Sequence, residues 1–439
     1  MLRQLWPLAM LYCGRLGTAL VGILLLPIFS RLLGPQEFGV VAIILSTQSL
    51  MVALDLGMAI VLGRDLAGLP AGAQSRGHAM FSHAERNLVR LYGTLMVVAL
   101  IASRFMALPL APLDIAAVVI LFGAATHQNV AQVSLLARQD YAWVGINQFA
   151  GIVLRNVFTL ACMQLIAANL TVFVLSQSLG AGLHALCTRW RLVRLLPAGA
   201  TSLKGSSFHS MSIPLLVQTI AGACAMQLDK PAVGAFAGAA ATAPYYLATV
   251  LALTPLTFLA GPVVQFFQPK VIGQIAAEAL SPALVRKFLV GILGSAFLPG
   301  LMLWLAAPAL TTLWLHGAHD HALVSDYVRI LVVGTSLGAL GFLPNVLLVA
   351  RRQYRFLATA STGLAIVVLA LSCWAASDGN VRMVCFAYAG YHILAAVIQW
   401  ARALTLDGEL RAALLPVTPM AVAASLGTVG GGLLLSRFL

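Results

Sequence analysis

Charged residues are scarce in this sequence. Only 9% of its 439 residues are Asp, Glu, Lys or Arg, whereas soluble domains usually contain about 25%. Hydrophobic residues make up 61% of the chain, and no segment between the apolar runs is polar enough to form a soluble domain. The composition therefore predicts a membrane protein and excludes an ordinary water-soluble fold.

Two motifs of common hydrolases are also missing. Neither a phosphate-binding GxxxxGK[ST] loop nor a zinc-binding HExxH motif occurs. The six cysteines have no CxxC spacing and lie in or beside apolar runs, which argues against a metal or disulfide framework. His316, His319 and His321 fall in a connection that we interpret as solvated rather than metal-binding. We predict no catalytic site, no metal and no cofactor, and the sequence gives no indication of ATP hydrolysis.

What the sequence does contain is a series of apolar segments, each near the roughly 20 residues that cross a bilayer as a helix. The predicted spans are 6–29, 40–62, 88–103, 115–137, 144–167, 172–187, 213–236, 245–267, 288–310, 328–350, 356–376, 383–401 and 414–435. The expected fold class is all-α, a polytopic membrane bundle of 12 to 14 transmembrane helices in two six-helix lobes.

A polar, basic connection near the middle of the chain divides the predicted spans into two sets. The expected domains are an N-terminal six-helix lobe (1–196), a cytoplasmic linker (197–211), a C-terminal six-helix lobe (212–402) and an additional hydrophobic segment (403–439). Repeated halves around a site at the midplane are the usual construction of secondary transporters.

Most basic residues lie in alternate connections, among them Arg138, Arg189, Lys270 and Arg351, and the opposite connections hold few. Short cytoplasmic loops are enriched in Lys and Arg, so this asymmetry predicts a cytoplasmic N-terminus in a bacterial inner membrane. Membrane topology thus accounts for the net charge of +13, and no nucleic-acid partner is expected.

The stretch from Leu26 to Gly39 (LPIFSRLLGPQEFG) is the most distinctive motif, and it is followed by Leu54–Gly57 (LDLG) and Arg64. In the second half, Gln227–Lys230 (QLDK) and Ala243–Ala248 (APYYLA) add to the pattern. These residues resemble the oligosaccharide flippases, the O-antigen and exopolysaccharide translocases of the multidrug/oligosaccharidyl-lipid/polysaccharide (MOP) exporter superfamily.

The resemblance implies two lobes that open alternately and pass an undecaprenyl-pyrophosphate-linked oligosaccharide repeat unit from the cytoplasmic to the periplasmic leaflet. Such a protein would serve O-antigen (lipopolysaccharide) or exopolysaccharide biosynthesis, would not be an enzyme, and would contact membrane lipids, a polysaccharide polymerase and a chain-length regulator. The alternatives are a drug or cation antiporter, or a lipid II exporter, of the same superfamily. A sugar polymerase or ligase is disfavoured because no large outer loop is predicted.

Two arginines lie deep within predicted spans, Arg15 in the first and Arg155 in the fifth. A charge near mid-bilayer costs roughly 2.5 to 3.5 kcal/mol on insertion scales, so each suggests a function. If the ligand is a pyrophosphate lipid, a guanidinium matches its oxygens bidentately and stays charged. The structural alternative is an ion pair, for example with Asp55.

Three glutamines extend this candidate substrate site. Gln128 and Gln132 are four residues apart in one span, and Gln148 is seven residues before Arg155 in the next, so each pair shares a helix face. Their amides suit sugar hydroxyls in a cavity. Hydrogen bonding between helices is an equally good explanation.

Four residues are candidates for gating or ion coupling. Asp55 is a proton carrier or the partner of a neighbouring arginine, and pairing is favoured. Asp229 and Lys230 lie late in the seventh predicted span and form either an outer-gate ion pair or a solvated helix end. Weak internal repetition aligns Lys230 with Arg31, which lies near a loop.

Overall fold

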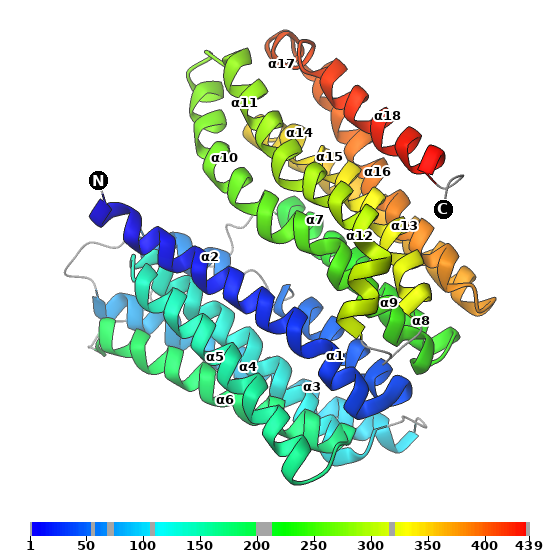
Figure 1. Ribbon diagram of the computed structural model, residues 1–439. Coiled ribbons are helices and arrows are strands. Elements are labelled where there is room, and N and C mark those ends of the chain that lie inside the picture. Colours follow the sequence, from blue (N-terminus) through cyan, green and yellow to red (C-terminus); the bar gives the residue numbers. More distant parts are fainter. Residues whose placement is uncertain are drawn as a thin grey trace. The chain divides into compact units, whose positions relative to one another are not determined.

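The computed structural model describes residues 2–53, 58–67, 74–105, 110–198, 213–315 and 321–435, and every regular element in these ranges is helical. The chain forms two compact units, Met1–Ser212 and Ile213–Leu439. The predicted boundaries of the linker and of the additional C-terminal segment remain predictions. Figure 1 shows the helices of each unit running alongside one another.

The first unit contains six helices in its described part. They are α1 (Leu2–Ala53), α2 (Met58–Ala67), α3 (Gln74–Phe105), α4 (Pro112–Ala137), α5 (Tyr141–Leu165) and α6 (Leu170–Leu195). α4 contacts each of the others. Its start follows from its sequence, because Pro112 occupies the first helical position and the Asp114 carboxylate accepts a hydrogen bond from the Ala111 amide at 3.2 Å.

The distinctive motif of the sequence divides α1 at Gly34, whose φ of 72° and ψ of 171° are not helical. Glycine adopts this conformation without the steric cost that a Cβ brings, and Pro35 then suits the first position of the second segment. Three residues on, Glu37 Oε2 accepts a hydrogen bond from the Leu170 amide at 2.7 Å, at the start of α6. The motif thus ends one helix segment and anchors the beginning of another.

The second unit has α13 at its centre, in contact with α9, α12 and α16. Its elements are α7 (Ile213–Gln227), α8 (Asp229–Phe236), α9 (Ala239–Thr254), the π-helix η1 (Pro255–Ala260), α10 (Gly261–Ala276), α11 (Pro282–Ile292), the π-helix η2 (Leu293–Phe297), α12 (Leu298–Leu315), α13 (His321–Ala339), α14 (Phe342–Ala350), α15 (Tyr354–Ser377), α16 (Val381–Leu406), α17 (Gly408–Leu414) and α18 (Thr418–Leu435).

Two glycines explain how closely α13 and α16 pack. A Cβ at Gly334 would lie 2.4 Å from the Ala389 backbone, and one at Gly338 would lie 2.7 Å from His392 Cβ. Small residues let membrane helices approach in this way. The segment Gly334–Gly338 (GTSLG) has the letters of a GxSxG hydrolase motif, but it lies inside a helix rather than at a strand-to-helix turn, so it is not a nucleophile elbow.

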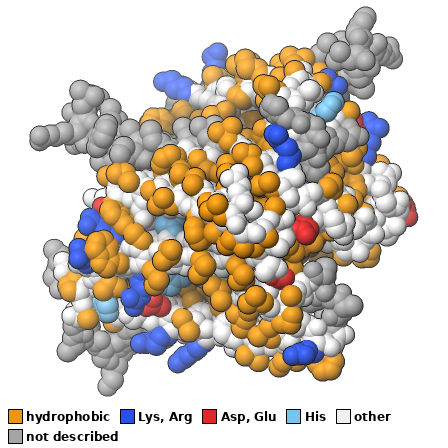
Figure 2. Space-filling model, turned by 60° about the horizontal axis from the view of Figure 1, so that its bottom comes forward, with side chains coloured by type: hydrophobic (Ala, Val, Ile, Leu, Met, Phe, Trp, Pro, Cys, Tyr) orange, Lys and Arg blue, Asp and Glu red, His pale blue; other side chains and the backbone are white. Residues whose placement is uncertain are grey.

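The surface of the protein is largely apolar. Hydrophobic side chains cover much of the face shown in Figure 2, and large residues such as Val97, Leu183, Leu305 and Ile366 are more than 36% exposed. A patch this extensive on a soluble monomer would aggregate, whereas lipid tails solvate it. The described surface is therefore that of a multi-pass membrane protein, as the composition predicted.

Ten helices in the described ranges are long and apolar enough to cross a membrane, or eleven if the bent pair α17–α18 is one span. Eleven is below the thirteen predicted spans for two reasons. α1 counts once although Gly34 divides it, and α7 and α8 are each too short because the helix is interrupted at Leu228. With these breaks considered, the predicted all-α membrane bundle is confirmed.

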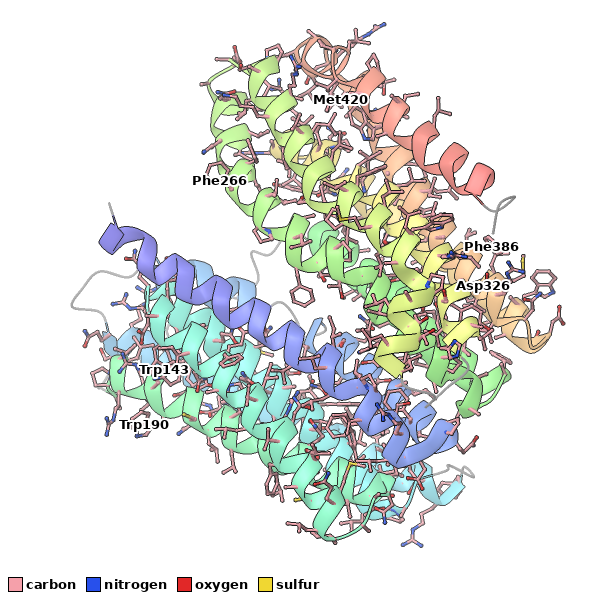
Figure 3. The ribbon with its side chains drawn as sticks, in the orientation of Figure 1. Trp143, Trp190, Phe266, Asp326, Phe386 and Met420 are labelled. Atoms are coloured by element: carbon pink, nitrogen blue, oxygen red, sulfur yellow. The ribbon has the colours of Figure 1, made fainter. Side chains whose placement is uncertain are left out.

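Aromatic and basic side chains mark one end of the first unit. Figure 3 shows Trp143 at the start of α5 and Trp190 near the end of α6 at this end. Arg191 lies 5.8 Å from the Trp143 ring centre, and Arg194 lies 3.9 Å from that of Trp190. Tryptophan and cationic residues gather at membrane–water interfaces, so this end lies at a bilayer boundary.

Candidate functional site

The predicted substrate residues of the first unit lie on α4 and α5. Gln132 Nε2 donates a hydrogen bond to Gln148 Oε1 at 3.1 Å, which joins the two helices. Gln128 points instead to α6, where its Nε2 lies 3.0 Å from His184 Nε2. The three glutamines thus belong to polar contacts among α4, α5 and α6, and lining of a transport cavity by them remains a prediction.

His184 is the centre of these contacts, and the sequence did not single it out. Its Nε2 is also 3.1 Å from Asn147 Nδ2, which donates a second bond to Thr188 Oγ1 at 3.0 Å. A Cβ at Gly151 would lie only 2.4 Å from the imidazole ring, so glycine there lets the ring lie against α5. Asn147 and Gly151 are four residues apart and therefore lie on one face of α5. This spacing is the sequence signal that could have pointed to the contact with His184.

Arg155 continues that face by another four residues. Its aliphatic part packs on α6, because a Cβ at Gly180 would lie 2.6 Å from Arg155 Cγ. The Nε atom is buried without a hydrogen-bond partner, and no carboxylate of the described residues forms an ion pair with the guanidinium. Within the described part of the chain, this cation inside the bundle therefore has no acid to balance it.

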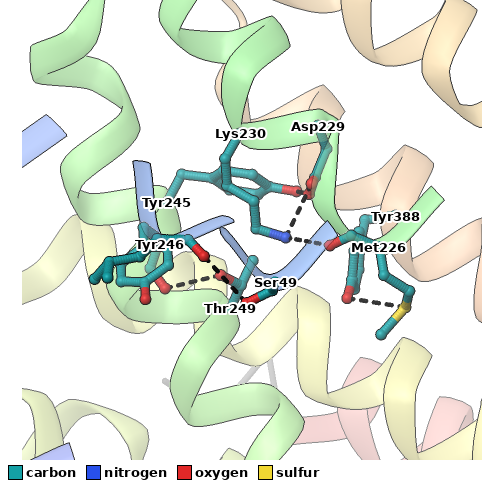
Figure 4. A network of polar contacts seen from close by, with 9 residues as sticks. Ser49, Met226, Asp229, Lys230, Tyr245, Tyr246, Thr249 and Tyr388 are labelled. Carbon is teal, nitrogen blue, oxygen red and sulfur yellow. Dashed lines mark hydrogen bonds and ion pairs between the residues drawn. The ribbon is translucent and has the colours of Figure 1, made fainter. Parts of the chain in front are cut away.

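The second unit holds a different cluster. Lys230 Nζ and Asp229 Oδ1 are 2.9 Å apart, and their side chains are 3% and 2% exposed. Lys230 Nζ also donates to the Met226 carbonyl oxygen at 2.7 Å, and the Tyr245 hydroxyl donates to Asp229 Oδ2 (Figure 4). The Tyr388 ring centre lies 5.0 Å from the ammonium. Of the two arrangements expected for Asp229 and Lys230, the solvated helix end is wrong, since both are buried.

The remaining predicted residues are less informative. Arg31 is exposed on α1 just before the break at Gly34, so its surroundings differ from those of its repeat counterpart Lys230. Arg15 belongs to α1, but its side chain lies outside the described part of the structure, and Asp55 lies outside the described residues altogether. A pairing of Asp55 with Arg15, and roles for these residues in gating or coupling, remain predictions.

Comparison with known proteins identifies the family. A sequence profile described as polysaccharide biosynthesis protein matches residues 28–317, which is more than half of the chain. No curated protein sequence matches the chain significantly.

Solved structures of transporters share the fold. A multidrug resistance MATE transporter of the MOP superfamily, in an inward-facing conformation, is 14% identical; the match covers 90% of this chain and 95% of that one, with a TM-score of 0.70. The lipid II flippase MurJ is 11% identical, over 96% of this chain and 92% of that one, with a TM-score of 0.67. A MOP transporter from Pyrococcus furiosus is 14% identical, over 90% and 93%, with a TM-score of 0.63.

At identities this low, the structural likeness establishes the fold alone, and the profile match establishes the family. Both agree with the resemblance noted in the sequence. The chain is a multi-pass membrane protein that belongs to the polysaccharide biosynthesis protein family and has the fold of the MOP superfamily of transporters and flippases.

Proposed function

We propose that the protein is a flippase that moves undecaprenyl-pyrophosphate-linked oligosaccharide repeat units from the cytoplasmic to the periplasmic leaflet of the inner membrane. Alternating access of its two lobes would expose the cargo first to one side and then to the other. Membership of a polysaccharide biosynthesis family and a transporter fold support this class of cargo. A polymerase and a chain-length regulator are the expected partners in O-antigen or exopolysaccharide synthesis.

The single observation that carries the proposal is the unbalanced cation at Arg155. Its Nε is buried and lacks a hydrogen-bond partner among the described residues. An uncompensated charge inside a membrane protein is costly, and it persists where a ligand or water supplies the missing interaction. A pyrophosphate supplies it well, because its oxygens accept charge-assisted bonds from the planar guanidinium. Arg15 is the second proposed cation of this site.

Neutral polar groups near Arg155 suit the sugar part of the cargo. Within the described residues, Gln132 Oε1 and Gln148 Nε2 have no protein partner and are not buried, so an acceptor and a donor are available. Gln128 lies on the same helix as Gln132 and adds a third amide. Amides with free donors and acceptors can bind hydroxyls in many orientations.

The expected direction of transport follows from charge. With the N-terminus in the cytoplasm, as the basic connections predict, an anionic pyrophosphate leaves the negative side of the membrane. The potential favours this step by roughly 2.3 kcal/mol per charge per 100 mV. Outward movement therefore does not require coupling to an ion.

A drug or cation antiporter would need an acidic residue with its charge available to a cation. Of the described buried acids, Asp229 is already paired with Lys230 and hydrogen-bonded by Tyr245, and Asp114 accepts a hydrogen bond from the Ala111 amide at the start of α4. The geometry thus favours an anionic cargo. A lipid II exporter carries a cargo of the same charge, so it is distinguished by experiment rather than by this site.

The test is a deletion strain in which the sidedness of lipid-linked intermediates is measured in spheroplasts. We expect the repeat unit to accumulate on the cytoplasmic face and to be exported again when the wild-type gene is restored. Lipid II sidedness and drug susceptibility should not change. Accumulation of lipid II inside would identify a lipid II exporter, and altered drug susceptibility with normal export would identify an antiporter.

A further inference from the structure

A groove of about 740 Å³ lies on the first unit between α3, α4 and α6. Its volume is within the range of about 300 to 1,000 Å³ that small-molecule sites occupy. The wall residues Val89, Ile120 and Leu186 are apolar, and Gly93 and Gly182 contribute to the lining. α3 is little buried against the protein along its apolar part, so the groove opens toward lipid.

The two glycines keep this groove empty. A Cβ at Gly93 or at Gly182 would meet no atom within 4 Å. At Gly151 and Gly180 of the same unit glycine has a packing reason, because a Cβ there would clash with a neighbouring helix. The glycines of the groove lack this reason, and side chains at these positions would instead project into open space.

One end of the groove is charged. Glu85 Oε1 accepts a bond from Arg189 Nε at 2.5 Å and lies 3.0 Å from His127 Nε2, while Arg189 Nη2 donates to Glu85 Oε2 at 3.2 Å. The Arg189 side chain is still 43% exposed, so one edge of its guanidinium remains accessible. His127 Nδ1 is buried without a partner in the described structure.

Positive charge exceeds negative charge around this end. Arg86 and Arg90 are exposed on α3, one turn apart and next to Glu85, and Arg194 lies over the Trp190 ring on α6. Glu85 balances only one of these arginines. Basic pockets between membrane helices on the cytoplasmic side are typical binding sites for anionic lipid headgroups.

Helix geometry places the charged end at a bilayer boundary. Nineteen residues separate Leu170 from Arg189, about 28 Å at 1.5 Å per residue, which nearly equals the hydrocarbon thickness of about 30 Å. The interfacial Trp190 lies at the same end (Figure 3). Along α3 the groove runs from Glu85 to Met96, about 16 Å, or roughly one leaflet.

We propose that this groove binds an anionic phospholipid of the cytoplasmic leaflet as a resident lipid, separate from the transported cargo. One acyl chain lies along Gly93 and Gly182, and the phosphate contacts the accessible edge of Arg189, with Arg86 and Arg90 adding electrostatic attraction. The placement in the cytoplasmic leaflet rests on the proposed orientation, whereas binding itself does not depend on which cargo is moved.

The length of the groove favours a phospholipid over a polyprenyl chain. A lipid chain that ends at mid-bilayer needs about half of the hydrocarbon thickness, which is what the groove offers. An undecaprenyl chain is several times longer and would leave most of its length outside. The apolar part of the lining also excludes a free phosphate as the main occupant, because phosphate gains nothing from it.

The experiment measures lipid binding to the full-length protein in detergent by native mass spectrometry, with phosphatidylglycerol, phosphatidylcholine and undecaprenyl phosphate as probes. Gly182→Leu places a side chain in the groove at a position where a Cβ meets nothing within 4 Å, and Gly363→Leu on α15 is its matched control, since a Cβ there also meets nothing within 4 Å. We expect Gly182→Leu to weaken phosphatidylglycerol binding roughly tenfold, equivalent to about 1.4 kcal/mol, and the control to bind like wild type.

The headgroup is tested by the paired change Glu85→Gln/Arg189→Gln, which removes both charges but keeps hydrogen-bonding groups on both helices. This variant should prefer phosphatidylglycerol over phosphatidylcholine clearly less than the wild type does, because it loses the direct contact with Arg189 and keeps only the attraction of Arg86 and Arg90. The proposal is overturned if Gly182→Leu binds normally, if the wild type shows no preference for the anionic lipid, or if undecaprenyl phosphate displaces phosphatidylglycerol at equal concentration.

Discussion

Two cations within the helix bundles, Arg155 in the first unit and Lys230 in the second, have opposite surroundings. Lys230 has a carboxylate at 2.9 Å, a backbone carbonyl at 2.7 Å and an aromatic ring beneath it. Arg155 has a buried Nε without a partner and no acid among the described residues. The charge of Lys230 is thus satisfied within the protein, whereas that of Arg155 is available to something else.

This difference separates a structural role from a binding role. A buried ion pair is costly to break, because removal of one partner leaves the other charge unsolvated. An unpaired buried charge is costly to keep, and removing it does not destabilise the fold. Substitution by a neutral residue should therefore destabilise the protein at Lys230 and leave its stability unchanged at Arg155.

The largest effect on stability is expected for Lys230→Met. It leaves Asp229 buried without its cation, which typically costs about 3 to 5 kcal/mol. The variant should show a strongly lowered melting temperature in detergent and reduced amounts in the membrane. The double variant Asp229→Asn/Lys230→Met, which removes both charges, should recover most of the loss. A stable single variant would show that the pair is not the tight contact described here.

A smaller loss is expected for His184→Leu. It removes the acceptor shared by Gln128 and Asn147, which leaves the Gln128 amide partly buried without this partner and Asn147 with only its bond to Thr188, at a cost of about 1 to 3 kcal/mol. Thermal unfolding in detergent measures the change. Cys187→Ser, an exposed position one turn further along α6, is the control and should melt like wild type. An unchanged melting temperature for His184→Leu would mean that the contacts around this ring are not important for stability.

The smallest effect on stability is expected for Gln132→Leu. Hydrogen bonds between membrane helices contribute about 0.6 kcal/mol on average, so loss of the bond to Gln148 should hardly change the melting temperature. If the amide contacts sugar hydroxyls, export should nevertheless fall clearly in the sidedness assay. Normal export by Gln132→Leu would show that this glutamine only joins α4 and α5 and does not bind the cargo.

The sequence predicted much of the fold because membrane helices have simple requirements. The apolar segments predicted the helices, and the break at Gly34 lies in the connection expected between the first two spans. Helical periodicity placed Gln128 with Gln132, and Gln148 with Arg155, and the structure brings Gln132 to Gln148.

Other features were not predictable from periodicity. A single histidine in an apolar span resembles an ordinary packing residue, so His184 emerged only when Gly151 and Gly180 showed how closely α5 and α6 approach. The burial of Asp229 and Lys230 depends on tertiary packing against Tyr245 and Tyr388, which are distant in sequence. In the sequence, adjacent charges at a helix break are as typical of a solvated helix end as of a buried ion pair.

Binding of the cargo by Arg155 is tested most directly by comparing export by Arg155→Gln with export by Arg104→Gln. The second change is at an exposed arginine at the end of α3. Membrane amounts and melting temperatures should match the wild type for both. We expect that Arg104→Gln restores delivery of the repeat unit to the periplasmic face in the deletion strain and that Arg155→Gln does not. A stable Arg155→Gln protein that exports at the wild-type rate would contradict it.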